Sequence, residues 1–272
     1  MSHALPDELA ALVEAGRPRL GAFSRIEYFS EIDSTNDAAL ARAARGAPHG
    51  TVVLADTQRA GRGRLGRAWH SPPDAGVYLS AILRASSWTD TLSLVTLAAG
   101  IAVVRGLRAA TGLEAELKWP NDVVVGRPWR KLAGVLSESA SASTRVDAVV
   151  VGIGINVRVS ALPPELAEKA TAVEVELGRP VDRAACTVEV LAALAEAVSR
   201  LVSGDRSWVA AEWRKHGRTG LGGVVRWSDG HRERRGVAVD IDETGGLLID
   251  AGSGRVDRVI SGEVFWERLS RE

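Results

Sequence analysis

The character of the sequence changes near His216, and this change constrains the possible folds most strongly. Upstream, segments with helical spacing of apolar residues, such as 91–110 and 183–202, alternate with short β-branched segments. Downstream, glycine and valine alternate with charged residues, and glycine-containing turns separate the short runs. We therefore predict an α+β unit over residues 1–216, followed by a separate small β-barrel over residues 217–272.

The expected elements follow from apolar periodicity and from capping and turn residues. Ser34 or Thr35 can cap a helix that has Asp37 in its acidic first turn. The expected helices are 7–15, 35–45, 91–110, 183–202 and 208–215. The expected strands are 23–29, 51–55, 77–83, 115–119, 122–125, 132–138 and 146–153, then 224–227, 236–241, 247–250 and 255–260, with turns at 228–230 and 244–246.

The composition is that of a soluble globular protein. Apolar residues make up 46% of the 272 positions and the formal net charge is zero, so nothing global favours nucleic acid or a membrane surface. The single cysteine, Cys186, lies in an apolar stretch and excludes a disulfide framework within the chain. The N-terminus lacks a signal-peptide pattern, and the longest apolar run, 94–104, is too short to cross a bilayer. We expect a cytoplasmic enzyme.

Residues 58–67 carry the most distinctive chemistry. This segment reads QRAGRGRLGR, with arginines placed among glycines. Glycine lets the backbone approach a ligand closely, and arginine supplies planar, permanently charged donors for carboxylate and phosphate. The segment therefore predicts a clamp that closes over an anion, although composition alone equally allows a solvated surface loop.

The same glycines also imitate a dinucleotide-binding fingerprint. Gly61, Gly63 and Gly66 satisfy the pattern G-x-G-x-x-G after an expected strand. That fingerprint requires a helix directly afterwards, because the helix N-terminus holds the pyrophosphate. Pro72 and Pro73 forbid an ordinary helix there, which argues against dinucleotide binding.

Three shorter motifs carry further polar groups. KWPND at 118–122 brings a cation, an amide and a carboxylate together at a turn, where they could bind phosphate, ribose or magnesium. KLAG at 131–134 starts a strand with a lysine, and GIGIN at 152–156 ends another with glycines and an amide. Taken alone, each motif is more often structural, for example as a turn or a lysine that snorkels at a sheet edge.

Together, these motifs resemble the pattern of the biotin–protein ligases. DSTN at 33–36, the loop at 58–69 and the three shorter motifs occur in the order and approximate spacing of that family. The resemblance extends from about residue 24 to residue 267, nearly the whole chain. It implies a mixed β-sheet backed by helices, similar to class II aminoacyl-tRNA synthetases, with a small SH3-like β-barrel at the C-terminus.

The resemblance also implies an ATP-dependent ligase reaction in two steps. The carboxylate of biotin attacks the α-phosphate of ATP, which gives biotinyl-5′-AMP and pyrophosphate. A lysine of a biotin carboxyl carrier domain, such as that of acetyl-CoA carboxylase, then attacks the mixed anhydride. Biotin and ATP with Mg²⁺ are thus the expected small-molecule partners, and no tightly bound prosthetic group is expected.

Individual site residues are implied by matching this chain to the family pattern. The implied biotin contacts are Ser34, Thr35, Asn36, Gln58, Arg62, Gly63, Arg64, Lys131 and Gly134. The implied ATP contacts are Trp69, Asn121, Asp122, Lys131 and Asn156, with Mg²⁺ at Asp122. Lys131, Arg64 and Lys118 are the expected catalytic residues, because attack of one anion on another requires fixed positive charge where negative charge gathers.

The sequence departs from the family pattern in three places. Only about 20 residues precede the first expected strand, too few for the N-terminal helix-turn-helix of some members, so we expect a short form that does not bind DNA. The segment between Asp122 and Lys131 is longer than in familiar members, which predicts a longer hairpin with a Gly-Arg-Pro-Trp tip. Leu65 stands where a polar or basic residue is common.

Two other functions remain open on the sequence. A lipoate or octanoate ligase or transferase shares the catalytic fold of biotin–protein ligases, and a non-catalytic module could bind biotin without activating it. The oligomeric state is also open, because an exposed sheet edge can pair across a two-fold axis to form a homodimer.

Overall fold

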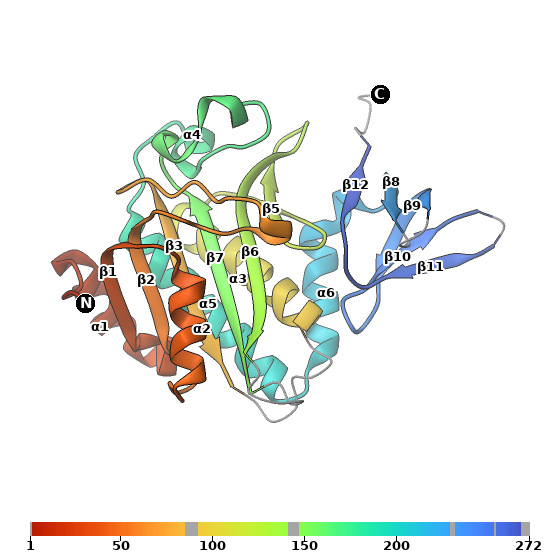
Figure 1. The fold of residues 1–272 in the computed structure, drawn as a ribbon. Helices are drawn as coiled ribbons and strands as arrows, with labels where there is room; N and C mark the ends of the chain where they lie inside the picture. The colour runs from red at the N-terminus through yellow and green to blue at the C-terminus, as the bar shows by residue number, and fades with distance from the viewer. Residues whose placement is uncertain (1, 85–91, 141–146, 229–231, 253, 268–272) are drawn as a thin grey trace.

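The computed structural model describes residues 2–84, 92–140, 147–228, 232–252 and 254–267 (Figure 1). Its main body is a seven-stranded mixed sheet with the strand order β1-β2-β3-β7-β6-β5-β4. The strands are β1 (Ile26–Ile32), β2 (Val52–Gln58), β3 (Gly76–Leu83), β4 (Glu116–Lys118), β5 (Asp122–Val125), β6 (Arg130–Ala140) and β7 (Ala148–Asn156). Strands β1 and β2 are parallel, and the remaining neighbours pair antiparallel.

Helices cover the two faces of this sheet unequally (Figure 1). The helices are α1 (Asp7–Leu20), α2 (Thr35–Ala44), α3 (Leu92–Thr111), α4 (Val173–Leu177), α5 (Arg183–Val202) and α6 (Arg206–Gly217). Helices α1, α3, α5 and α6 belong to one large apolar layer, in which α3 packs on α5 and on β6. Among the helices that the structure describes, α2 alone covers the opposite face, through a smaller cluster that includes Phe29, Ala39 and Ile82. The loop that follows β2 crosses the upper part of that face (Figure 1).

Helix α3 is the central core helix of the large layer. It has 20 residues, and by length and composition alone it could cross a membrane, in contrast to the shorter run expected from the sequence. However, 67% of its most apolar stretch is buried inside the fold, and Leu94, Ile101 and Leu107 are fully buried. These contacts are those of a core helix.

A second sheet follows α6 and lies to one side of the main body (Figure 1). Its strands are β8 (Val224–Ser228), β9 (Glu233–Ile241), β10 (Leu247–Asp250), β11 (Val256–Val259) and β12 (Val264–Trp266), and they pair antiparallel in the order β11-β10-β9-β8-β12. The indole of Trp119 donates to the carbonyl of Gly245 over 3.0 Å, which fastens this sheet to the motif KWPND. The tip of the β5–β6 hairpin adds an edge-to-face contact between Trp129 and Trp266, with ring centroids 5.6 Å apart.

Most expected elements are present, and the differences have local causes. Helix α1 continues five residues beyond the expected end, and Pro18 lies inside its last turn without ending the helix. Strand β1 starts later than expected because residues 21–24 form a 3₁₀ turn. Helix α4 and strand β12 were not expected, since five and three residues are too short to show a period. Residue 91 of one expected helix and residues 229–230 of one expected turn lie outside the described residues.

Candidate active site

A row of glycines on β6 and β7 forms the floor of the site. Gly134 of β6 pairs with Gly154 of β7, and Gly152 lies two residues before Gly154 on the same face of β7. A Cβ atom on Gly154 would come within 2.5 Å of the Trp69 ring, and one on Gly152 within 2.2 Å of the Asn36 side chain. Glycine at these positions therefore lets the indole of Trp69 and the amide of Asn36 lie directly on the sheet.

The start of α2 and the end of β2 form a polar wall beside this floor. Ser34 caps α2 by accepting a hydrogen bond from the Asp37 amide over 3.3 Å. The Thr35 amide donates to Gln58 Oε1 over 2.8 Å, and Gln58 Nε2 donates to Ser71 Oγ over 2.9 Å. These bonds fix the orientation of the Gln58 amide, so the end of β2 and the start of α2 present a rigid set of polar atoms.

Two small cavities meet at Lys131 and Trp69. The first, of about 40 Å³, has these described residues among its lining: Ser34, Thr35, Asn36, Gln58, Arg62, Gly63, Arg64, Trp69, Asn121, Lys131, Gly134 and Leu136. The second, of about 70 Å³, has Trp69, His70, Lys131, Asn156 and Leu162 among its lining. Every residue implied to contact biotin thus borders the first cavity, whereas Asn156 borders the second.

Lys131 and Asp122 form an ion pair at this junction. Lys131 Nζ lies 2.6 Å from Asp122 Oδ1 and 5.3 Å from the centroid of the Trp69 ring. Lys118 is opposite Asp122 in the β4–β5 ladder. Burial lowers the pKa of Lys118, the nearby Asp122 carboxylate opposes this effect, and the charge of Lys131 adds to it. Neither Lys118 nor Asp122 is among the residues that line the two cavities, so the structure places both beside Lys131 and outside the cavity walls.

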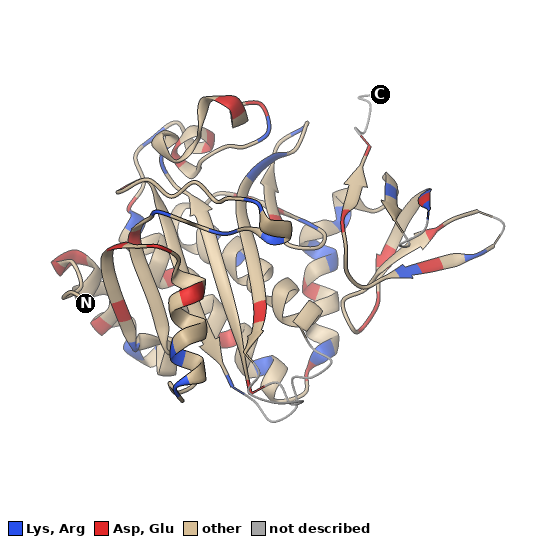
Figure 2. Ribbon diagram, viewed as in Figure 1, with Lys and Arg blue, Asp and Glu red and all other residues tan. Residues whose placement is uncertain are grey.

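The arginine-glycine loop folds back on itself over the site. Gly63 N donates to the Arg67 carbonyl over 2.7 Å, and Trp69 N donates to the Gly61 carbonyl over 2.8 Å. Leu65 is at the exposed tip in the left-handed region, with φ of 58°. The segment after this tip is extended and contains no helix, as Pro72 and Pro73 predicted. Figure 2 shows basic residues along this loop and at the adjoining end of β6.

The arginines of the loop have different partners. Arg64 donates to Asn121 Oδ1 over 3.1 Å and to the carbonyl of Gly262, in the second sheet, over 3.1 Å. Arg67 pairs with Glu263. The Arg62 guanidinium instead pairs with two carboxylates, those of Asp37 at 2.6 Å and Glu138 at 2.7 Å. The loop is therefore held from the second sheet on one side and from α2 and β6 on the other.

The second cavity is bordered by two residues with polar side-chain nitrogens, Trp69 and Asn156. The indole nitrogen of Trp69 is buried and has no hydrogen-bond partner in the structure. The amide nitrogen of Asn156 donates to the Thr171 carbonyl over 3.1 Å. A buried donor without a partner is costly, so a ligand acceptor that reached Trp69 would be stabilised.

Two residues that hydrogen-bond to Asn36, Ser80 and Glu138, were not predicted from the sequence. Ser80 is a fully buried serine in the apolar strand β3, and a polar residue within a continuous apolar run was the available signal. Glu138 lies four residues after Gly134, on the same face of β6 as the glycine floor, so the two-residue strand period was the signal.

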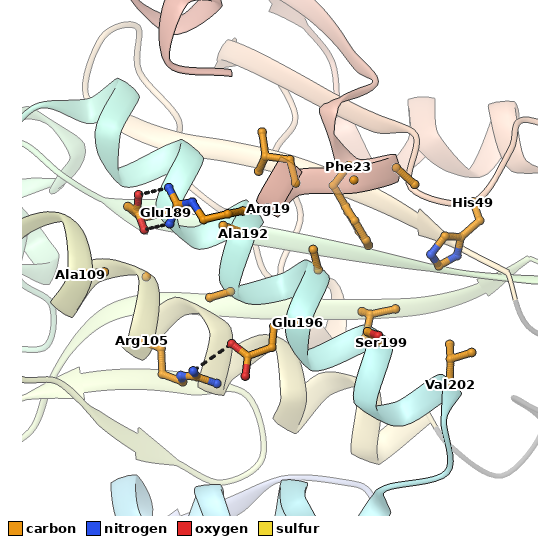
Figure 3. A pocket seen from close by; sticks show the side chains of 17 residues that line it. Arg19, Phe23, His49, Arg105, Ala109, Glu189, Ala192, Glu196, Ser199 and Val202 are labelled. Atoms are coloured by element: carbon orange, nitrogen blue, oxygen red, sulfur yellow. Dashed lines mark hydrogen bonds and ion pairs between the residues drawn. The ribbon is translucent and has the colours of Figure 1, made fainter. Parts of the chain in front are cut away.

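A larger hollow lies away from this site. It measures about 730 Å³ and lies on the helical side, between the end of α1, α3 and α5 (Figure 3). Its lining includes the alanines Ala22, Ala109, Ala192, Ala193 and Ala195, and the ion pairs Arg19–Glu189 and Arg105–Glu196 lie at it. It contains none of the motif residues, so hollow size alone does not locate the chemistry.

The chain is similar to known proteins over most of its length. Residues 28–156 match the model of the biotin/lipoate A/B protein ligase family, and residues 221–266 match the biotin protein ligase C-terminal domain. The chain is 36% identical to a biotin–[acetyl-CoA-carboxylase] ligase of Mycobacterium tuberculosis, covering 88% of each chain. It is 33% identical to a bifunctional ligase/repressor of Bacillus subtilis, covering 87% of this chain and 72% of that protein.

A solved structure supports the same relationship. The biotin protein ligase of Aquifex aeolicus in complex with biotin and ATP superposes with a TM-score of 0.77 at 30% identity, covering 90% of this chain and 99% of that one. The fold and the sequence thus define a member of the biotin/lipoate ligase class. Within that class, the chain belongs to the biotin–protein ligases. The family and the fold class expected from the sequence are both confirmed.

Proposed function

We propose that this protein activates biotin with ATP and transfers it to a lysine of a biotin carboxyl carrier domain. One observation carries the proposal: Lys131 stands between two cavities with different linings. The first is bordered by the polar wall of Thr35 and Gln58, and the second by Trp69 and Asn156. A carboxylic acid in the first cavity and a nucleotide in the second would bring the carboxylate and the α-phosphate together beside the Lys131 ammonium group.

In the first step, a carboxylate oxygen of biotin attacks the α-phosphorus of ATP. The new oxygen–phosphorus bond gives biotinyl-5′-AMP, and the bond to the β-phosphate breaks to release pyrophosphate. Negative charge accumulates on the phosphoryl oxygens in this step, so fixed cations near them lower the barrier. We assign this role to Lys131, with Arg64 closing over the product from the loop.

In the second step, the ε-amine of the acceptor lysine attacks the carbonyl carbon of the mixed anhydride. An amide bond forms, the acyl–phosphate bond breaks, and AMP leaves with the electron pair as the amine loses a proton. This step requires the acceptor to reach a preformed intermediate, and it requires no covalent enzyme nucleophile. Cys186 is not suited to such a role, because it is buried and its pKa is raised to about 12 by burial.

The described residues fit a magnesium ion that enters with the nucleotide. No group of three or more metal-binding side chains occurs among the residues that the structure describes, and Asp122 is a single carboxylate paired with Lys131. Mg²⁺ commonly takes one or two protein carboxylates and completes its shell with water and substrate phosphates. We therefore propose that Asp122 supplies one ligand to a phosphate-bound Mg²⁺, whose charge would offset that of the phosphates.

Ligand entry requires the arginine-glycine loop to open. The first cavity measures about 40 Å³, whereas small-molecule sites usually enclose roughly 300 Å³ or more. Biotin therefore needs Arg62, Arg64 and Trp69 to move from their present positions. The exposed tip at Leu65 and the glycines on both sides allow this movement.

The proposal is tested by acid-dependent exchange of labelled pyrophosphate into ATP. Exchange should occur with biotin and be far slower with lipoate or octanoate at equal concentration. Exchange with lipoate but not biotin would instead assign a lipoate ligase. Binding of biotin without exchange would indicate a non-catalytic binding module.

A further inference from the structure

Ser80 connects two residues of the polar wall from beneath the site. Its side chain is fully buried on β3 and borders neither active-site cavity. Ser80 Oγ lies 2.6 Å from Asn36 Oδ1 and 2.8 Å from Thr35 Oγ1. A hydroxyl has one hydrogen, so Ser80 can donate to only one of these two oxygens.

The orientation of Asn36 decides which oxygen receives that hydrogen. Asn36 Nδ2 is 2.7 Å from Glu138 Oε2 and 3.3 Å from the Leu136 carbonyl, and both of these atoms are acceptors. The Glu138 carboxylate is itself paired with Arg62, and a carboxylate in an ion pair can only accept hydrogen bonds. The amide nitrogen must therefore face Glu138, and Asn36 Oδ1 must face Ser80 as an acceptor. Ser80 donates its hydrogen to Asn36.

The direction of the next bond follows. Because the Ser80 hydrogen is committed to Asn36, the 2.8 Å contact with Thr35 is favourable only if Thr35 donates to Ser80 Oγ. The alternative acceptor for the Thr35 hydroxyl is Gln58 Oε1, which is farther away at 3.1 Å and already accepts the Thr35 amide. With its hydrogen directed toward Ser80, Thr35 Oγ1 presents lone pairs to the cavity that it lines.

We propose that Ser80 is a positioning residue that fixes the Thr35 hydroxyl as an acceptor toward the ligand, so that the site selects an acid whose head group carries an N–H donor. The chain of bonds from Arg62 through Glu138, Asn36 and Ser80 to Thr35 favours the direction of the hydroxyl toward Ser80 over the longer contact with Gln58. The remaining lone pair of Gln58 Oε1 presents a second acceptor at the same wall.

This inference rests on the proposed function and explains its choice of substrate. The ureido ring of biotin offers N–H donors, whereas a dithiolane ring or an alkyl chain offers none. A head group without donors leaves buried acceptors unpaired, and a site built to bond a donor rejects such analogues strongly. Without Ser80, the Thr35 hydroxyl could turn toward Gln58 or toward a ligand acceptor, and the selection would weaken.

The test compares two ligands in the variant Ser80→Ala of the full chain. The first ligand is biotin, and the second is the acid with the same thiolane ring and pentanoate chain but without the urea. We expect calorimetry to show biotin binding weakened about tenfold, and binding of the urea-free acid changed less than twofold. In pyrophosphate exchange, KM for biotin should rise by the same factor while kcat stays within twofold.

The matched control is Ser137→Ala on β6, which is separated from β3 by β7 in the same sheet. Ser137 also makes a hydroxyl–hydroxyl contact, with Thr96 at 2.9 Å, but on the face of the sheet that packs against α3. This control should leave both ligands unaffected. Equal weakening of both ligands by Ser80→Ala, or no weakening of biotin binding, overturns the proposal.

A double-mutant cycle with Thr35→Val separates positioning from a general structural effect. If Ser80 acts through the Thr35 hydroxyl, then Ser80→Ala in the Thr35→Val background should weaken biotin binding less than twofold further. A full tenfold effect in that background would contradict the proposed route. If the wild-type protein activates no acid at all, the proposed function fails, whereas unchanged biotin affinity in an active Ser80→Ala variant defeats only this inference.

Discussion

The ammonium group of Lys131 lies 2.6 Å from the carboxylate of Asp122, at the wall shared by the two cavities of the site. The pair keeps both charges compensated in a half-buried position while the site is closed. An arriving acyl-phosphate offers the same ammonium group a second anionic partner. The resting partner of the proposed catalytic lysine is thus the residue proposed to take magnesium.

Replacement Lys131→Ala should slow biotin-dependent pyrophosphate exchange at least 100-fold, because it removes a fixed cation from the position of developing charge. Circular dichroism and thermal unfolding should show that the fold persists. The control Lys215→Ala removes an exposed lysine that pairs with Glu212 on α6, remote from the site. Wild-type exchange by Lys131→Ala would show that this lysine has no catalytic role.

Replacement Arg64→Gly should release biotinyl-5′-AMP before it meets its acceptor. Arg64 holds the loop through Asn121 and the Gly262 carbonyl, and glycine both removes these bonds and makes the loop more flexible. Mass spectrometry of a mixture with a bystander protein should then detect biotin on bystander lysines. The control Arg59→Gly, at the start of the same loop, loses only surface pairs with Asp33 and Glu31. Strict labelling of the carrier domain by Arg64→Gly would contradict the clamp.

The second sheet contains an aspartate whose charge stabilises the fold. Burial alone would raise the pKa of Asp242, but hydrogen bonds from Arg258, the Thr244 hydroxyl and backbone amides lower it from 3.8 to about 2. A lowered pKa stabilises the fold at pH values above the pKa of this carboxyl in the unfolded chain. This stability is lost as pH falls from about 4 toward 2. The shift corresponds to about 2 kcal/mol of unfolding free energy at pH 7.

Replacement Asp242→Asn should therefore lower the unfolding free energy by about 2 kcal/mol at pH 7, and by about half as much at pH 3. Denaturant titrations at the two pH values measure the difference. In the control Asp250→Asn, on β10 of the same sheet, the asparagine oxygen can still accept from the Gly252 amide, so the change should be smaller and less pH-dependent. An Asp242→Asn effect of equal size at both pH values would show that charge is not the cause.

The layout of elements was readable from the sequence where local signals were strong. Helix α5 begins and ends at the expected residues because Asp182 caps a regular apolar stripe. The pairing of strands was not readable, since β3 and β7, which meet along eight residue pairs, are separated by α3 and three further strands. Long-range pairing is decided by tertiary packing, which no local pattern encodes.

The site was readable as a set of motifs, but its internal bonding was not. The loop, KWPND, KLAG and GIGIN meet around one cavity because the sheet order places β7 and β6 side by side. Pairing of Arg62 with Glu138, across 76 positions, depends on which face of β6 turns toward α2. The proposed role of Ser80 depends on counting hydrogens between side chains of α2, β2, β3 and β6, and no local sequence pattern reveals these contacts.

The most direct test of the account is a single-turnover experiment in two stages. The protein is first incubated with biotin, ATP and Mg²⁺, and the bound products are analysed by mass spectrometry. A biotin carboxyl carrier domain is then added without further ATP. The account predicts enzyme-bound biotinyl-5′-AMP in the first stage, and its loss with biotin appearing on one carrier lysine in the second. Absence of the adenylate, or an adenylate that forms but never transfers biotin to the carrier, would contradict the account.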